Sequence, residues 1–486
     1  MSALSTRGAE QLAGWLGGSR PWLDGRSVRR ALTTLTGWVA LVLVTAGIAV
    51  FAVEDRKIGL AVAALVLLLG VFAADPILLA VVALPGVFIL QRVGGSSTNL
   101  SAADMLVFLG ALVSLLHIRW SEAKHLRGFL QGIVIYEATL LVVVMAHTNR
   151  YDVVEWFHRL SYLGGSVLVG WVVARSGRAR QAFRLYLLGA SVIAVIAMEH
   201  AVKLHFKAAQ WGLYQKNAVG AMMWVAVVVA QLNPPWTGVS RRQARIAKWL
   251  CLGGLLASQS RQSWVVLCGV IVLVVLMNPE VRRRSKLLLL GIIPLGLLLY
   301  YSFSTQFVVN PKFNTVSIRL RQLSSALRVW QLSPLVGEGM RFYHLPQFIN
   351  ITQPPNVIIG NLASSGIVGS LGFVAFVVIA IRVVARLPVE FRTLALAVLV
   401  GHLTEGLFDE FWIGSYSAAS MIVVGIALGM ADQARRRSPL GVARTSEEAT
   451  GAPGASLSSL GSLGSLGSRW RAERARPGVR PTWSRS

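Results

Sequence analysis

The chain has 486 residues, of which 54% are hydrophobic and only 14% are charged, which leaves too little polar surface to coat a soluble globule of this size. A formal net charge of +26 would suggest nucleic acid as the partner of a soluble protein. Here, however, the Lys and Arg residues gather in short connections between apolar runs, as in the cytoplasmic loops of membrane proteins. The composition therefore excludes a soluble globule and makes the lipid bilayer, and no nucleic acid, the expected partner.

Apolar runs long enough to cross a bilayer of about 30 Å recur along the chain. They predict an all-α polytopic integral membrane protein with about 12 to 14 transmembrane helices. The first run begins near Ala31 and lacks a small-residue cleavage site, so no removable signal peptide is expected. The expected spans are 31–53, 58–74, 77–90, 105–118, 129–146, 160–174, 183–200, 218–231, 246–257, 264–277, 287–303, 358–381, 394–403 and 415–430.

Charge placement predicts the orientation of these spans. With the N-terminus in the cytoplasm, the connections that are rich in Arg and Lys all fall on the cytoplasmic side of the membrane. The same alternation places five segments outside, including one long extracytoplasmic loop: 149–159, 203–216, 258–263, 304–357 and 404–412. We therefore expect a disordered cytoplasmic N-terminus over 1–30, a membrane domain over 31–432 and a disordered, basic cytoplasmic tail over 433–486.

The stretch 319–369 is the one long polar interruption in this hydrophobic chain. A bilayer tolerates irregular backbone only outside the hydrocarbon region or where it lines a protein cavity. We therefore expect substrate to be handled in this stretch.

Several outward basic residues could bind a diphosphate, because a guanidinium group donates to two oxygens at once and keeps its charge when partly desolvated. The alternative is that these side chains extend to lipid headgroups. Arg261 stands in a very short connection between two apolar runs, where it must face the interface or a protein-lined cavity. The candidates are Lys216, Arg261, Arg319, Arg328 and Arg341.

Acidic and imidazole side chains near the same stretch could take a proton from an acceptor hydroxyl. Glu338 and His344 lie within eight residues of each other, next to glycines that would let backbone amides approach a ligand. A second acidic cluster, formed by Glu405, Asp409 and Glu410, is either an alternative base or a polar cap on a helix pair.

Other polar or sulfur-bearing residues inside the expected spans carry less information. Glu137 lies in the middle of a span and either anchors helix packing or lines a pathway. Cys251 and Cys268 fall in or beside apolar runs, so we expect small buried side chains and no disulfide framework. The histidines show no metal-ligand spacing, so no metal site is predicted.

Four short pieces, in this order, resemble the bacterial O-antigen ligase and O-antigen polymerase superfamily of membrane glycosyltransferases, over roughly Gln215 to Gly369. Each piece alone is unspecific, and the resemblance depends on their order, spacing and shared outward placement. The pieces are Gln215-Lys216-Asn217 with Gly220; Ser260-Arg261; Arg328-Val-Trp330 followed by Pro334-Leu-Val-Gly337-Glu-Gly339; and Asn356 followed by Leu362 and Gly366-Ile-Val-Gly369.

The resemblance implies transfer of a glycan from an undecaprenyl-diphosphate carrier to an acceptor glycan or lipid, without a metal or nucleotide cofactor. Arg261 and Arg328 would hold the donor diphosphate, with Lys216 and Arg319 as further candidates. Family members often place a histidine directly before the asparagine that matches Asn356, and here that place is Pro355.

The leading prediction is thus a metal-independent surface-polysaccharide polymerase or ligase on the outer face of the bacterial cytoplasmic membrane. Other polysaccharide assembly proteins are candidate partners. The candidate catalytic residues are Glu338, His344 and Asn356. The alternatives are an exporter or flippase of polysaccharide or lipid-linked oligosaccharide, and a catalytically silent assembly subunit. Pro355 leaves the group that activates the acceptor unidentified.

Overall fold

The computed structural model describes residues 72–91, 101–277, 315–348, 350–408 and 415–437, and the single positions 70 and 296. Within these ranges every regular element is a helix, and Trp211 and Tyr214 form an isolated bridge outside the helices. The predicted all-α fold is confirmed.

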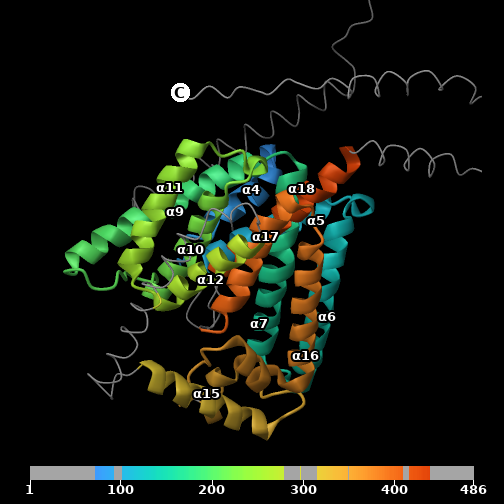
Figure 1. Cartoon of the computed structure of the whole chain (residues 1–486). Coiled ribbons are helices and arrows are strands. Elements are labelled where there is room, and N and C mark those ends of the chain that lie inside the picture. Colours follow the sequence, from blue (N-terminus) through green and yellow to red (C-terminus); the bar gives the residue numbers. More distant parts are fainter. Residues whose placement is uncertain are drawn as a thin grey trace, which may run out of the picture. The chain divides into compact units, whose positions relative to one another are not determined.

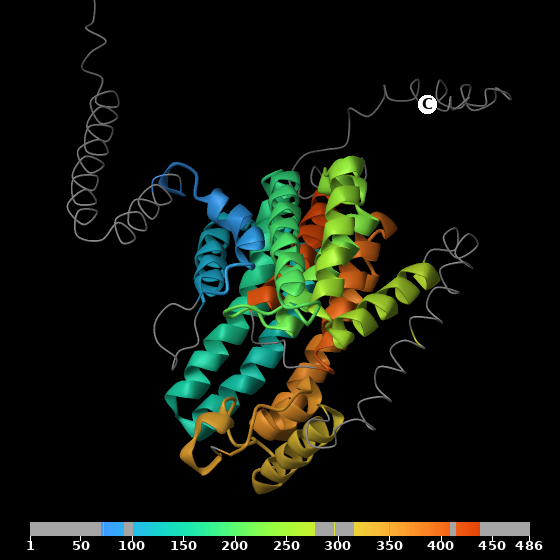
Figure 2. The ribbon, with the colours of Figure 1, turned by 90° about the vertical axis from the view of Figure 1, so that its left-hand side faces the viewer.

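A helix that is apolar on every side lies at the centre of the described residues. This helix, α10 (Lys216–Leu232), buries every residue from Ala218 to Ala230, as expected for a helix enclosed by others. Figures 1 and 2 show α10 among its neighbours. It packs against α9 (Ala179–Lys203), α11 (Arg241–Ser258), α12 (Arg261–Met277) and α17 (Val389–Glu405).

Two shorter helices, α4 (Ile77–Gly86) and α5 (Ala102–His117), pack against each other, and α4 also packs against α9. The start of α5 is set by a capping box, in which Ser101 and Asp104 each bind the other's backbone N–H. Two short 3₁₀ turns lie at Trp120–Glu122 and Pro235–Thr237. The side chains of Ser101 and Asp104 therefore define where α5 begins.

Two long helices, α6 (Lys124–His147) and α16 (Val357–Ala385), run antiparallel and in contact along their lengths. Ring contacts join them at two levels: Phe129 with Phe376 at 6.1 Å between centroids, and Tyr136 with Phe373 at 5.6 Å. This pair forms a rigid support for the polar segment that follows α15.

By length and composition, four described helices could cross a bilayer: α6, α9, α16 and residues Ser417–Arg437 of α18 (Ser415–Arg437). Shorter apolar helices are α4, α5, α10 and α12. The chain is thus an all-α membrane protein. The spans expected at 31–53 and 287–303 lie outside the described residues, as does most of 58–74, so the helix count stays a prediction.

The segment 149–159, expected as an outward connection, is helical instead. It forms α7 (Arg150–Leu160), which continues through a π-helical turn (Ser161–Gly165) into α8 (Ser166–Arg175). Asn149 caps α7 by accepting the backbone N–H of Asp152 at 3.0 Å. Four polar residues of α7 are buried: Asp152, Glu155, His158 and Arg159.

The long loop expected over 304–357 also contains a helix, α15 (Thr315–Leu332), followed by 3₁₀ turns at Phe342–His344 and Pro346–Phe348. Ala326 and Val329 of α15 are one turn apart and bury against Phe342, Phe348 and Ala363 of the following segment and α16. This small apolar cluster holds α15 against the following segment and α16 (Figure 1).

Helix α16 is broken at Gly366, where the backbone adopts φ +59° and ψ −160°. The segment 333–339 fills the break. Ile367 and Val368 donate their backbone N–H groups to the carbonyls of Pro334 and Leu335, at 2.9 and 3.0 Å. A break in an apolar helix is tolerated when other groups satisfy the freed backbone in this way.

The contact runs in both directions, because the segment also donates to α16. The N–H of Glu338 binds the carbonyl of Ala363 at 3.0 Å, and the N–H of Gly339 binds that of Ser364 at 3.1 Å. A side chain at Gly337 would meet the α16 backbone at 2.5 Å, so only glycine fits there. We call this two-way contact of 334–339 with α16 the backbone interlock.

Replacing Gly366 with Ala is expected to destabilise the protein. Its φ and ψ belong to a region that is essentially restricted to glycine, which costs about 1–3 kcal/mol for other residues. An added Cβ would also lie 2.3 Å from the carbonyl oxygen of Leu335. Thermal unfolding of the purified chain in detergent should start at a lower temperature.

The matched control is Gly269→Ala in α12, where an added Cβ meets nothing within 4 Å. This variant should unfold like the wild type. Equal unfolding temperatures for the Gly366 variant and the control would contradict the interlock.

Candidate functional site

The first turns of α10 and α12 lie side by side. Ser260, just before α12, donates its hydroxyl to the Oδ1 atom of Asn217 at 3.4 Å and lies 2.9 Å from the hydroxyl of Ser263. The reversal between α11 and α12 is short because Gln259 adopts a left-handed conformation with φ +51°. The sequence therefore places Lys216 and Arg261, the first residues of the two helices, at one end of the bundle.

A third cation joins them from α15. Arg319 donates to the Oε1 atom of Gln262 at 3.3 Å, next to Arg261 in the first turn of α12. Gln262 is buried, and its Nε2 atom has no hydrogen-bond partner among the described residues. We call Lys216, Arg261 and Arg319 the basic cluster.

The electrostatics of this end favour an anion. Arg261 and Arg319 are half-buried and Lys216 is exposed, so the charges range from partly desolvated to fully hydrated. The N-termini of α10 and α12 add partial positive charge and backbone N–H donors. Such an arrangement suits an anion with many oxygens, such as a diphosphate.

Two other predicted diphosphate ligands lie elsewhere. Arg328 is exposed on α15 and donates to Ser325 of its own helix at 3.0 Å. Arg341 is only 2% exposed, and its Nε atom donates to Glu155 at 2.8 Å. The charge of Arg341 is thus matched by a buried carboxylate of the protein itself.

Glu155 of α7 is the centre of a buried polar network. Besides Arg341, it accepts a hydrogen bond from Arg159 at 3.1 Å. Arg159 in turn donates to the hydroxyl of Tyr136 at 2.8 Å and to the Oδ1 atom of Asn361 at 3.0 Å. One network therefore joins α6, α7, α16 and the segment that carries Arg341.

Two further α7 side chains complete this network. Burial raises the pKa of the Asp152 carboxyl, while backbone N–H groups of Arg341 and Met340 act against that rise. Burial lowers the pKa of His158, and the charge of Glu155 opposes this. The Nδ1 atom of His158 lies 3.1 Å from the Nη2 atom of Arg341, where a neutral imidazole can accept a hydrogen bond from that guanidinium.

The apolar runs predict a connection at 149–159, so these α7 residues are not predicted as part of a site. A usable signal was present. Asp152, Glu155 and Arg159 recur at the spacing i, i+3, i+7, which places them on one face of a helix. Polar residues with helical periodicity beside an apolar span predict a buried polar contact.

The glycines around Glu338 serve a different purpose from the one expected. They bring the backbone amides of Glu338 and Gly339 against α16 and leave these amides no capacity to approach a ligand. Gly339 also lies so close to Asp152 that an added Cβ would meet its carboxylate at 2.7 Å. The side chain of Glu338 itself is half-buried.

His344 has the environment of a neutral imidazole. It is exposed, and its ring stacks on Tyr151 of α7 at 5.4 Å between centroids. Partial burial and then the charge of Arg341 lower the pKa of His344. At neutral pH the imidazole is therefore able to accept a proton.

Asn356 caps α16. Its Oδ1 atom accepts the backbone N–H groups of Ile358 and Ile359 at 2.9 and 3.1 Å, and its Nδ2 atom donates to the carbonyl of Leu407 at 2.9 Å. This asparagine fixes the start of α16 against the end of α17.

The second acidic cluster is described only at Glu405, which is buried and accepts the indole N–H of Trp224 at 2.9 Å. Asp409 and Glu410 lie outside the described residues. Glu137 is buried in α6, and neither of its carboxylate oxygens has a hydrogen-bond partner within the described part of the chain. Cys251 is buried and Cys268 is half-buried.

Comparison with known protein families gives a match over part of the chain. The family model for O-antigen ligase matches residues 246–374, which comprise most of α11, all of α12 and α15, the interlock and the first part of α16. The expected family resemblance is confirmed over this segment, and O-antigen ligase-type or polymerase-type activity is supported at the level of the family. The piece Gln215-Lys216-Asn217 lies outside the matched residues 246–374. No curated relative matches the chain.

Replacing Glu155 with Gln is expected to destabilise the protein strongly. The change leaves Arg159 and Arg341 buried without their shared carboxylate, and breaking a buried ion pair costs about 3–5 kcal/mol. Thermal unfolding in detergent should occur at a clearly lower temperature than in the wild type.

The control is Glu199→Gln, which removes the exposed ion pair with Lys203 at 2.6 Å. This variant should unfold like the wild type, because water screens the charges. If both variants behaved alike, α7 would not be held by Glu155.

Proposed function

We propose that this chain, whose residues 246–374 carry the O-antigen ligase domain, transfers glycan from a polyprenyl-diphosphate carrier to an acceptor on the outer face of the cytoplasmic membrane. The donor would be an undecaprenyl-diphosphate-linked glycan, and the acceptor a glycan or a lipid. Transfer needs no nucleotide, because the sugar is already activated by its diphosphate.

The basic cluster is the observation that carries this proposal. Lys216, Arg261 and Arg319 come from three helices, and contacts between their neighbours bring them to one end of the bundle. This end is formed largely by the matched segment 246–374, which links the cations to the family.

The chemistry would be a displacement at the anomeric carbon of the donor sugar. The acceptor oxygen forms a bond to that carbon as the bond to the diphosphate oxygen breaks, and the diphosphate leaves with the electron pair. Negative charge grows on the departing oxygen in the transition state, where the basic cluster would stabilise it.

The acceptor hydroxyl must lose its proton in this step. We assign this task to His344, which is exposed, stacks on Tyr151 and has a lowered pKa. It would take the place of the histidine that the family often has where this chain has Pro355. Glu338, which is half-buried and lies six residues earlier, is the second candidate.

Replacing Arg261 with Ala is expected to lower transfer about 100-fold, because a donor that binds the leaving group in the transition state is lost. The measurement is surface polysaccharide in a strain that lacks the wild-type chain, together with the amount of lipid-linked donor. Donor should accumulate on the outer face of the membrane.

Arg321→Ala is the matched control, since Arg321 is exposed on α15 two residues from Arg319. It should support normal polysaccharide. Undiminished product from Arg261→Ala and Arg319→Ala would overturn the proposal, and accumulation of donor on the inner face would favour the exporter.

Replacing His344 with Gln should lower the transfer rate by about 100-fold or more, as expected when a general base is lost. In the wild type, the rate should persist at the ordinary imidazole pKa of about 6.5 and fall only at lower pH, because the pKa of His344 is lowered and protonation then removes the base. His205→Gln, at an exposed loop histidine, should leave rate and pH profile unchanged. An unaltered rate in the His344 variant would leave Glu338 as the candidate to test next.

A further inference from the structure

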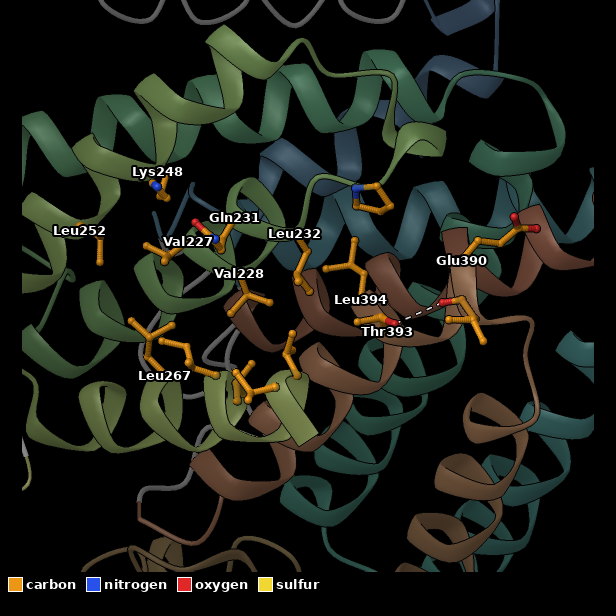
Figure 3. Close-up of a pocket in the computed structure, with 16 residues that line it drawn as sticks. Val227, Val228, Gln231, Leu232, Lys248, Leu252, Leu267, Glu390, Thr393 and Leu394 are labelled. Carbon is orange, nitrogen blue, oxygen red and sulfur yellow. Dashed lines mark hydrogen bonds between the residues drawn. The ribbon is translucent and has the colours of Figure 1, made fainter. Parts of the chain in front are cut away.

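A cavity of about 700 Å³ lies at the opposite end of α10 from the basic cluster. Its walls come from the C-terminal halves of α10 and α12, from α11 and from the first turns of α17 (Figure 3). Most of the lining is aliphatic, including Val228, Leu252, Leu267 and Leu394. The volume is within the range of about 300–1,000 Å³ of small-ligand sites.

A second, basic cavity of about 610 Å³ adjoins it. The two border each other, because Gln231, Leu232 and Lys248 line both. The added cations are Arg241 and Arg245. Together with Lys248 they recur at i, i+4 and i+7 along α11, which puts all three on one face of the helix.

The two ends of this space carry opposite charges. Figure 3 shows Lys248 and Glu390 at opposite ends of the apolar cavity. A negative group would be attracted to the end with Lys248, Arg241 and Arg245 and repelled from the end with Glu390.

An aromatic side chain indicates where the basic end lies relative to the lipid headgroups. Trp249, the neighbour of Lys248 on α11, is 64% exposed, and the ammonium group of Lys248 lies 4.7 Å from its ring centroid. Exposed tryptophans of membrane helices sit at the level of the lipid headgroups. The basic end is thus where a lipid phosphate would lie, and the apolar cavity extends from it between the helices.

We propose that this space binds an anionic glycerophospholipid, with its phosphate at Arg241, Arg245 and Lys248 and acyl chain in the apolar cavity. Basic pockets between membrane helices are a common form of such sites. The polyprenyl-diphosphate donor is not the occupant, because its diphosphate belongs at the other end of α10, roughly 24 Å away for 16 residue steps. This exclusion of the donor rests on the proposed function, whereas the two cavities and the charges that line them do not.

The test uses the full-length chain, purified in detergent and stripped of lipid. Phosphatidylglycerol or phosphatidylcholine is added, and bound lipid is counted by native mass spectrometry while thermal unfolding is followed in parallel. Phosphatidylglycerol should bind more tightly and raise the unfolding temperature, because a ligand of the folded state stabilises it. Equal binding of the two lipids would overturn the proposal.

Charge variants locate the site. Lys248→Glu should weaken phosphatidylglycerol binding about fivefold or more, given the usual contribution of one basic residue near an anionic lipid. Arg242→Glu is the matched control, since Arg242 is an exposed cation of the same helix and lines neither cavity. Equal loss in both variants would point to general surface attraction and contradict a built site.

A neutral variant tests the apolar cavity. Thr393→Trp places a large ring at a half-buried position of its wall and should reduce binding without changing charge. Size-exclusion behaviour checks its folding, and if it misfolds, the Lys248 comparison still decides. Displacement of phosphatidylglycerol by undecaprenyl phosphate at lower concentration would assign the space to the carrier and overturn the phospholipid proposal.

Discussion

The backbone interlock between 334–339 and α16 is the interaction on which the rest of the site depends. An apolar helix cannot be broken at Gly366 unless the freed N–H and carbonyl groups find partners, and the segment 334–339 supplies four such hydrogen bonds. The same contact fixes the position of the backbone segment that carries Glu338, Arg341 and His344. It also explains why the piece from Pro334 to Gly339 and the piece around Gly366 occur together in the family resemblance. Each provides hydrogen-bond partners for the backbone of the other.

The network around Glu155 adds a second attachment. Two guanidinium groups share one buried carboxylate, and their remaining donors bind Tyr136, His158 and Asn361. Because a buried charge without a partner is so costly, this set must form as a unit. It ties α7 to the segment after α15 and so determines where Tyr151 supports His344.

Charge is thus used in three ways in this protein. Arg341 is neutralised by Glu155 and holds structure. Lys216 and Arg261 of the basic cluster lie at the N-termini of α10 and α12, where the helix dipoles add to their positive charge. The cations of α11 gather at the other end of α10, beside an apolar cavity. Burial and neighbouring groups, rather than residue type, distinguish these roles.

The sequence by itself determined the all-α membrane fold, most described helices to within a few residues, and the family resemblance of the segment with Arg261 and Gly366, because apolar runs and glycine positions are local properties. It also singled out Lys216, Arg261 and Arg319 as anion ligands, a role that remains a proposal. Only the tertiary structure decided that Arg341 faces Glu155, that Asn356 caps α16 and that α7 and α15 are helices. These outcomes depend on contacts between residues far apart in the chain, such as the 186 positions that separate Glu155 from Arg341, and local patterns do not encode such pairings.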